Sequence, residues 1–297
     1  PILHGVRVAA LPSPLESHAI GETVQDERVT VLLSTPTFLR AYMRKIDPEK
    51  FRSLRMAVAG AEKLPPDLMK AFQEKFQIPL MEGYGLTETS PVVAVNIPDP
   101  TGAGVNAGTR AGSVGRLMPG MTARIVDPES GQSKPLSDTG MLHLRGPNIF
   151  CGYLGDEERT RQVLRDRWFV TGDLAKFDED GFLFIEGRLS RFSKIGGEMV
   201  PHGTVEESII RALGLDSGQQ DTQPVVVVGV PDEAKGEALV VITTAEIPAD
   251  ALREKLAAAG LPNLWIPRTI RRVDRIPALA SGKLDLKGCE ALARGQA

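Results

Sequence analysis

The first 95 residues constrain the fold most, because strand and helix patterns alternate along them. Leu68, Phe72 and Phe76 recur every four residues and therefore share one face of a predicted helix. A helix should also begin at Ser34-Thr35-Pro36, where a hydroxyl can cap the first turn and proline fits within it. Strands joined by helices form parallel sheets, so a βαβ subdomain is predicted. Its expected strands are Val6–Leu11, Val29–Leu33, Leu54–Ala59 and Pro79–Glu82, with helices at Pro14–Asp26, from Ser34, and at Pro65–Phe76.

Two further regions follow. Between residues 92 and 186 short β-rich runs alternate with turn-forming clusters, which favours an antiparallel β region with strands at Ala123–Val126, Gly140–Arg145, Trp168–Val170 and Phe182–Ile185. Beyond Arg188 the pattern predicts a compact α+β module: a helix at Thr204–Leu213, strands at Pro224–Val230 and Ala238–Thr244, a helix at Pro248–Ala259, a strand at Arg268–Val273 and a helix at Leu284–Ala293. The predicted class is therefore α/β, with a larger domain followed, after about residue 188, by a small α+β domain.

Composition argues against several functional classes. A chain of 297 residues is long enough for about two domains. A net charge of -3 argues against nucleic acid as the main partner, and no apolar run approaches the length of a membrane span. The two cysteines, Cys151 and Cys289, fit a reducing compartment and no disulfide framework. The four histidines lack metal-ligand spacing, which argues against structural zinc.

The run Gly83–Thr89 places an aromatic ring, a hydroxyl and a carboxylate in one glycine-containing turn. It follows the expected strand Pro79–Glu82, and in parallel sheets ligands bind beyond the carboxyl ends of strands. The segment Gly60-Ala61-Glu62 occupies the same position after the preceding strand. A purine, a phosphate oxygen and Mg²⁺ held by Glu88 could meet there. The alternative is a plain turn in which Tyr84 is a core aromatic and Glu88 is solvated.

Three later segments contain candidate functional residues, and each also has a simple structural explanation. Asp173 and Arg188 could bind ribose hydroxyls or form a surface salt bridge. Gly196-Gly197 permits close backbone approach or a tight turn. Lys283 follows Ser281-Gly282 and could act as a mobile positive charge or lie in solvent.

In chain order, five motifs together resemble the adenylate-forming superfamily of acyl/aryl-CoA ligases, luciferases and nonribosomal peptide adenylation domains: Gly83–Thr89, Thr171-Gly172-Asp173, Gly187-Arg188, Lys194–Glu198 and Ser281-Gly282-Lys283. The resemblance implies that residues 1–187 are part of the large AMP-binding domain, 188–191 a hinge and 192–297 the small mobile domain. It implies ATP-dependent formation of an acyl-adenylate, followed by transfer of the acyl group to a thiol, with ATP/AMP and Mg²⁺ required.

The same resemblance implies roles for single residues. Lys283, Thr87 and Glu88 would be catalytic, with Glu88 also the magnesium ligand. Gly196, Gly197 and Glu198 would line the thiol tunnel, and Ser190 and Arg191 would form the hinge, where the family usually has Asp or Lys at the position of Ser190. Nucleotide contacts would come from Gly60, Ala61, Glu62, Gly83, Tyr84, Gly85, Thr87, Asp173, Arg188 and Lys283.

Within the superfamily, residues 33–39, 60–64 and 191–200 look most like the acyl-[acyl-carrier-protein] synthetase branch. This implies a long-chain fatty acid substrate, the phosphopantetheine thiol of acyl carrier protein as acceptor, and a cytoplasmic enzyme whose parent can be fused to a membrane-associated 2-acylglycerophosphoethanolamine acyltransferase at the inner membrane. Arg191, Lys194 and Arg211 would dock the acidic carrier protein. Free CoA as acceptor, or a non-catalytic nucleotide- or acyl-binding remnant, are the alternatives. The family's phosphate loop matches no segment, so a C-terminal fragment that is inactive alone is expected.

Overall fold

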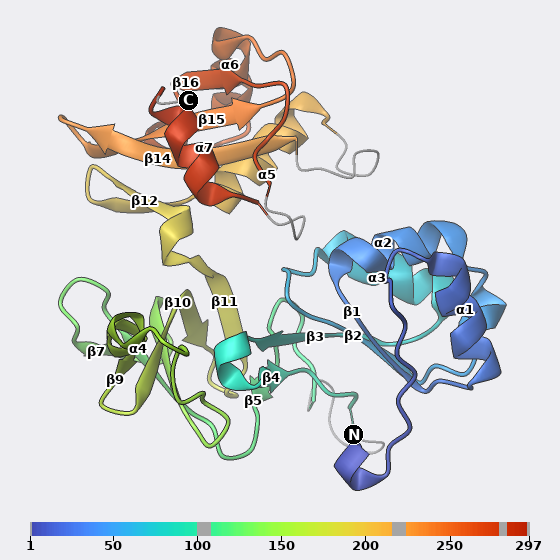
Figure 1. Ribbon diagram of the computed structural model, residues 1–297. Helices are drawn as coiled ribbons and strands as arrows, with labels where there is room; N and C mark the ends of the chain where they lie inside the picture. The colour runs from blue at the N-terminus through green and yellow to red at the C-terminus, as the bar shows by residue number, and fades with distance from the viewer. Residues whose placement is uncertain (1, 100–107, 216–223, 279–283, 296–297) are drawn as a thin grey trace. The chain divides into compact units, whose positions relative to one another are not determined.

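The structure is a computed structural model that describes residues 2–99, 108–215, 224–278 and 284–295 (Figure 1). The chain divides into two compact units, Pro1–Glu186 (unit 1) and Gly187–Ala297 (unit 2). Each unit combines helices with sheets, as predicted for an α/β chain. In the described ranges no helix is long and apolar enough to cross a membrane.

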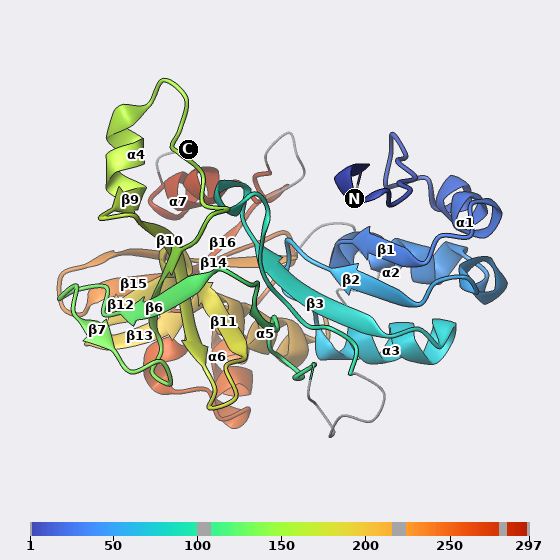
Figure 2. The same cartoon turned by 90° about the horizontal axis from the view of Figure 1, so that it is seen from below.

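Unit 1 begins with the predicted βαβ arrangement (Figure 2). Its first sheet has the order β1-β2-β3-β4-β5, in which β1, β2 and β3 are parallel and β4 and β5 are antiparallel additions. The elements are α1 (Ser17–Asp26), β1 (Val31–Ser34), α2 (Pro36–Lys45), β2 (Met56–Ala59), α3 (Pro66–Phe76), β3 (Leu80–Gly85), β4 (Val92–Val95) and β5 (Arg116–Leu117).

Local sequence accounts for two of these helices. The Thr35 side chain accepts a hydrogen bond from the Phe38 amide and Pro36 occupies the first turn, which confirms the predicted start of α2. In α3 the predicted face of Leu68, Phe72 and Phe76 is buried in the core of unit 1. The two phenylalanine rings of α3 lie 4.8 Å apart, centre to centre.

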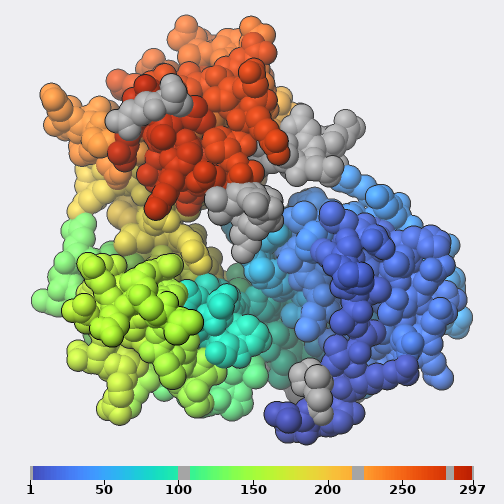
Figure 3. Space-filling view, in the orientation of Figure 1, coloured from blue at the N-terminus to red at the C-terminus, as the bar shows by residue number. Residues whose placement is uncertain are grey.

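The strand predicted at Val6–Leu11 is wrong. Residues 6–11 lie in no helix or strand, and the side chains of Val6 and Val8 are 57% and 56% exposed. Figure 3 shows this beginning of the chain running over the surface of unit 1. A β-branched run favours extended backbone, but it becomes a strand only where a neighbouring strand accepts its hydrogen bonds.

The predicted antiparallel region forms a sheet of order β11-β10-β8-β6-β7, with β9 paired to β10. The expected strand Trp168–Val170 is longer than predicted: β10 runs on to Phe177, with an irregular register between Val170 and Leu174. Gly172, at φ +78°, lies in that irregular stretch. The elements are β6 (Thr122–Val126), β7 (Ser133–Lys134), β8 (Gly140–Arg145), α4 (Glu157–Val163), β9 (Leu164–Arg165), β10 (Trp168–Phe177) and β11 (Leu183–Arg188).

Unit 2 has one sheet with a hydrophobic core on each face. In β14, Val225 and Val227 face the core that contains α5 and α6, whereas Val226 and Val228 face the core that contains α7. Burial on both faces explains the continuous apolar run of this strand. The sheet order is β13-β12-β15-β14, with β16 parallel to β15, and the elements are β12 (Phe192–Ile195), β13 (Glu198–Pro201), α5 (His202–Leu213), β14 (Val225–Asp232), β15 (Gly236–Thr243), α6 (Ala249–Ala258), β16 (Thr269–Arg272) and α7 (Leu286–Ala293).

Candidate functional site

The two predicted loop segments of unit 1 meet at one edge of the parallel sheet. Ala59, the last residue of β2, pairs with Glu82 of β3. Gly60 follows β2, and Gly83 lies at the neighbouring position of β3, so that a Cβ atom at Gly60 would lie 3.6 Å from the Gly83 carbonyl oxygen. The structure thus brings Gly60 and Gly83 together at the predicted edge, but Gly83-Tyr84-Gly85 continues β3 and pairs with β4 instead of forming the predicted turn.

Tyr84 connects this edge to the antiparallel sheet. Its hydroxyl donates a hydrogen bond to Oδ2 of Asp173. Its ring packs against the hydrophobic core of the antiparallel sheet, which includes Leu142, Leu144 and Ala175. Asp173 lies in the irregular stretch of β10 and is only 3% exposed. Its amide donates to the Thr171 hydroxyl at 3.0 Å. Arg188 ends β11, the strand next to β10 in the sheet. Tyr84 is therefore both a core aromatic and a partner of a buried carboxylate.

Glu88 is held by a loop that sequence reasoning did not include. It lies in a 3-10 turn over Thr87–Thr89, and its Oε1 accepts a hydrogen bond from the Tyr153 hydroxyl at 2.7 Å. Its carbonyl oxygen accepts the Phe150 amide at 2.9 Å. Burial, and then the Glu88 carboxylate, raise the pKa of Tyr153, so the hydroxyl remains a donor at neutral pH. Glu88 is thus a half-buried turn residue whose carboxylate is hydrogen-bonded to Tyr153.

Glu88 could hold Mg²⁺ only if a nucleotide supplied further oxygen ligands. The described residues contain no group of three or more His, Cys, Asp or Glu side chains able to hold a metal ion. Glu88 would supply one carboxylate, and Mg²⁺ typically combines one or two carboxylates with phosphate oxygens. The site therefore suits a cation that arrives with its phosphate ligands.

Glu82 is a second residue that sequence reasoning missed. It is 7% exposed, and its Oε1 accepts the Leu64 amide at 3.1 Å, which ties the loop after β2 to β3. Burial raises the pKa of this carboxyl, against smaller lowering effects of the Leu64 amide and Lys63. The one signal in the sequence was an acidic residue directly after the apolar pair Leu80-Met81. Glu62, by contrast, directs its carboxylate to Thr37, whose hydroxyl donates at 2.7 Å.

In unit 2 the two-glycine segment forms a tight turn. Ile195 pairs with Glu198, and Gly196 and Gly197 connect them with φ of +58° and +91°. Both values lie in the left-handed region that favours glycine. The role of these residues in a thiol tunnel stays a prediction. Ser281, Gly282 and Lys283 lie outside the described residues.

Arg191 is not available for docking a partner, contrary to expectation. Its guanidinium lies 2.5 Å from Glu206 Oε1 and donates to the Val227 carbonyl at 2.9 Å. Its side chain is only 18% exposed. Lys194 and Arg211 are exposed and remain candidates for that role. Ser190, the other predicted hinge residue, is also exposed.

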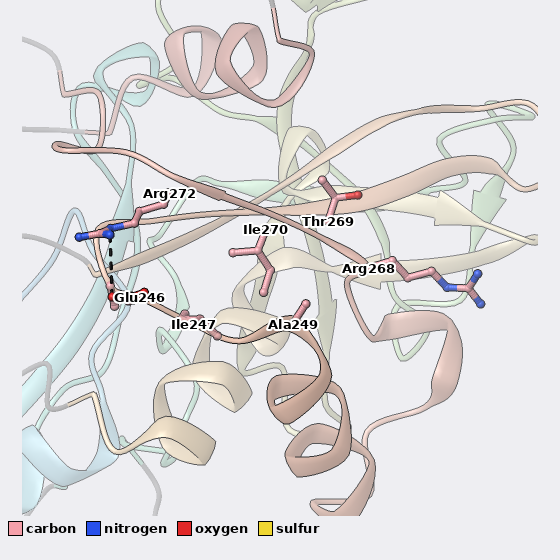
Figure 4. A pocket seen from close by; sticks show the side chains of 8 residues that line it. Glu246, Ile247, Ala249, Arg268, Thr269, Ile270 and Arg272 are labelled. Carbon is pink, nitrogen blue, oxygen red and sulfur yellow. Dashed lines mark ion pairs between the residues drawn. The ribbon is translucent and has the colours of Figure 1, made fainter.

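A separate pocket of about 500 Å³ in unit 2 lies between α6 and β16 and is lined by none of the predicted site residues (Figure 4). Arg272 there is 3.9 Å from Glu246. Figure 4 shows Arg268 and Arg272 pointing in opposite directions, so their guanidinium groups do not converge on one ligand.

Comparison with known proteins gives the same family over most of the chain. The profile of the AMP-binding enzyme family matches residues 1–154, and that of the AMP-binding enzyme C-terminal domain matches residues 218–283. The mouse (Mus musculus) mitochondrial medium-chain acyl-CoA ligase ACSF2 is 31% identical over 290 residues, 95% of this chain and 45% of that protein. The 3-hydroxybenzoate–CoA ligase of Aromatoleum sp. (strain CIB) is 32% identical over 272 residues, 89% of this chain and 49% of that protein.

Among solved structures, ATP-bound MatB from Rhodopseudomonas palustris matches with a TM-score of 0.74 and 27% identity, over 93% of this chain and 53% of that one. The chain spans about half the length of the relatives it matches. Because the family profile covers more than half of the chain, and the motif residues that it contains meet at one sheet edge, this chain belongs to the AMP-binding enzyme family.

Proposed function

We propose that this chain supplies the adenylate-binding edge and the C-terminal domain of an AMP-forming acid–thiol ligase. In this reaction a carboxylate attacks the α-phosphate of ATP, giving an acyl-adenylate and pyrophosphate, and a thiol then attacks the acyl carbon and releases AMP. The observation that carries the proposal is the joining of Tyr84 to Asp173 beside the close approach of Gly60 to Gly83.

Each of these contacts suits a nucleotide. A carboxylate has about four acceptor positions, so Asp173 would accept ribose hydroxyls in addition to the hydrogen bond from Tyr84. The absence of a side chain at Gly60 would let a flat base lie against the backbone there, whereas the corresponding space at Gly83 is filled by Val95 and Ala94. The Thr87 hydroxyl, which is exposed, would donate to phosphate. Glu88 would ligate the Mg²⁺ that shields the phosphate charge, and Arg188 would add donors toward the ribose.

For the thiol acceptor, CoA is the better candidate. The two relatives described above are named as CoA ligases, one for medium-chain acyl and one for hydroxybenzoate substrates. Acyl carrier protein with a long-chain fatty acid is the second candidate, favoured by the branch resemblance of residues 191–200 and by the exposed Lys194 and Arg211. Supplying acyl-AMP and comparing the rates of acyl transfer to CoA and to holo-carrier protein separates the two.

The adenylate site is tested by AMP binding to the chain, measured by titration calorimetry. AMP should bind, and Asp173→Asn, which keeps the shape of the side chain and removes its charge, should weaken binding about tenfold, equivalent to ~1.4 kcal/mol. Glu179→Ala, an exposed acidic residue in the following turn, is the matched control and should bind like the unaltered chain. No AMP binding, or equal affinity in Asp173→Asn, would overturn the proposal.

A further inference from the structure

The loop between β8 and α4 holds Glu88 through both its backbone and its side chain. The Asn148 amide donates to the Thr89 carbonyl at 2.7 Å, and the Phe150 amide donates to the Glu88 carbonyl at 2.9 Å. The Tyr153 hydroxyl completes the set with its 2.7 Å hydrogen bond to Glu88 Oε1. Residues 148–153 therefore fix the turn at two backbone positions and at its one carboxylate.

Tyr153 is itself held by three contacts. Its amide donates to the Thr160 hydroxyl at 2.9 Å, which anchors it to α4. Its ring meets Phe150 edge-on at 5.0 Å, and the Arg159 guanidinium lies over it, 4.1 Å from the ring centre. Phe150 in turn contacts Phe169 of β10 at 5.6 Å. The position of the hydroxyl is thus set by contacts with α4 and, through Phe150, with β10.

A fixed donor changes what the glutamate can do. A glutamate side chain in a turn loses substantial rotamer freedom when it is ordered, and that loss opposes ligand binding if it occurs only on binding. With Oε1 already held by Tyr153, the carboxylate is ordered before a ligand arrives. Residues that hydrogen-bond to metal ligands commonly set ligand orientation in this way.

We propose that Tyr153 is a positioning residue for Glu88, whose hydroxyl holds Oε1 so that the other carboxylate oxygen is presented to the Mg²⁺ that accompanies the nucleotide. The inference rests on the proposed function, because it assumes that a nucleotide and its cation bind beside Thr87 and Glu88. It adds a residue distant in sequence that none of the recognised motifs contains.

The test measures binding of ATP to the chain by calorimetry, with and without Mg²⁺, and binding of AMP in EDTA. Tyr153→Phe keeps the packed ring and removes only the hydroxyl. It should reduce the Mg²⁺-dependent gain in ATP affinity about tenfold and leave AMP affinity in EDTA unchanged. Glu88→Gln should abolish the gain, and Tyr153→Phe should add nothing in the Glu88→Gln background, because the two residues act through one contact.

Tyr42→Phe is the matched control. Its hydroxyl also makes a tertiary hydrogen bond within unit 1, to the Pro14 carbonyl at 2.9 Å, but the residue is buried in the hydrophobic core that contains α2 and α3. It should bind both nucleotides like the unaltered chain. An equal loss of AMP and Mg²⁺-dependent ATP binding in Tyr153→Phe would show that the hydroxyl only supports the fold, and an unchanged Mg²⁺ gain would show that it does not position Glu88; either overturns the inference.

The two proposals fail in different ways. If the unaltered chain binds no AMP in EDTA, the proposed nucleotide site is wrong and the role of Tyr153 falls with it. If AMP binds and depends on Asp173, but Mg²⁺ gives the unaltered chain no gain in ATP affinity, only the inference about Tyr153 is overturned.

Discussion

Lowering the pH from 7 to 5 should destabilise unit 2 through a single histidine, His202. This residue begins α5, is 3% exposed, and has its Nε2 2.8 Å from the Ser193 hydroxyl oxygen. Burial, and then the positive charge of Arg191, lower its pKa from 6.5 to about 3. Its Nδ1 is buried and has no hydrogen-bond partner, so a second ring proton would have no acceptor.

The size of the effect follows from proton linkage. In the unfolded chain His202 takes up a proton as the pH falls below 6.5, whereas in the folded unit it stays neutral until the pH nears 3. Above pH 6.5 His202 is neutral in both states and does not lower the free energy of unfolding. Between pH 6.5 and 3 the free energy of unfolding falls as the pH is lowered. Between pH 7 and 5 the loss is about 2 kcal/mol, and the full loss near pH 3 is about 5 kcal/mol.

The two tryptophans of the chain allow each unit to be followed separately, since Trp168 lies in unit 1 and Trp265 in unit 2. In a Trp168→Phe background, urea unfolding is monitored by Trp265 fluorescence at pH 7 and pH 5. His202→Gln, which can still bond to Ser193, should lose about 2 kcal/mol less than the His202 protein over this interval. His18→Gln, an exposed histidine in α1, is the control. An equal pH-dependent loss in His202→Gln would refute the assignment.

Two further predictions concern the complete ligase reaction. When the two half-reactions are assayed separately, Gly197→Leu should leave acyl-AMP formation largely intact and slow acyl transfer to the thiol. Gly197→Ala introduces the same strain of a left-handed φ with a smaller side chain and is the control. Equal slowing in both variants would indicate backbone strain rather than obstruction of the thiol. Lys283→Ala should lower adenylation about 100-fold or more while thioester formation from supplied acyl-AMP survives, and an equal loss in both half-reactions would contradict a role in adenylation.

Most elements of the fold could be predicted because each buries a regular apolar pattern. The helix α3 and the strand β14 both place their apolar residues in hydrophobic cores. The helix α4 was not predicted, because none of its residues is buried and its sequence therefore has no periodic apolar pattern. It begins instead at a cap, where the Asp156 carboxylate accepts the Arg159 amide at 3.0 Å.

The parts of the site that follow from neighbouring strands could be predicted from the sequence. The contacts between residues far apart in the sequence could not. Gly60 follows β2 and Gly83 lies in the neighbouring parallel strand β3, so the pairing of the two strands is sufficient to place them together. The partner of Glu88 is 65 residues away, and the partner of Glu82 is 18 residues away. Neither pairing leaves a local pattern, because a tyrosine in a loop and a glutamate in a strand are compatible with many environments.

Arg191 shows what such a distant contact implies for the predicted hinge. Its guanidinium and the Glu206 carboxylate together satisfy the backbone of Val227, whose amide donates to Glu206 at 2.6 Å. Glu206 is 6% exposed, and losing the partner of a buried charge costs about 3–5 kcal/mol. Arg191 is therefore tied to α5 and β14 of unit 2, and a rotation that broke its pair with Glu206 would have to overcome that cost. Gly187, at φ +149°, and the exposed Ser190 lie just before it. If the C-terminal domain turns during catalysis, as the family resemblance implies, we expect the dihedral changes at residues 187–190, with Arg191 moving together with unit 2.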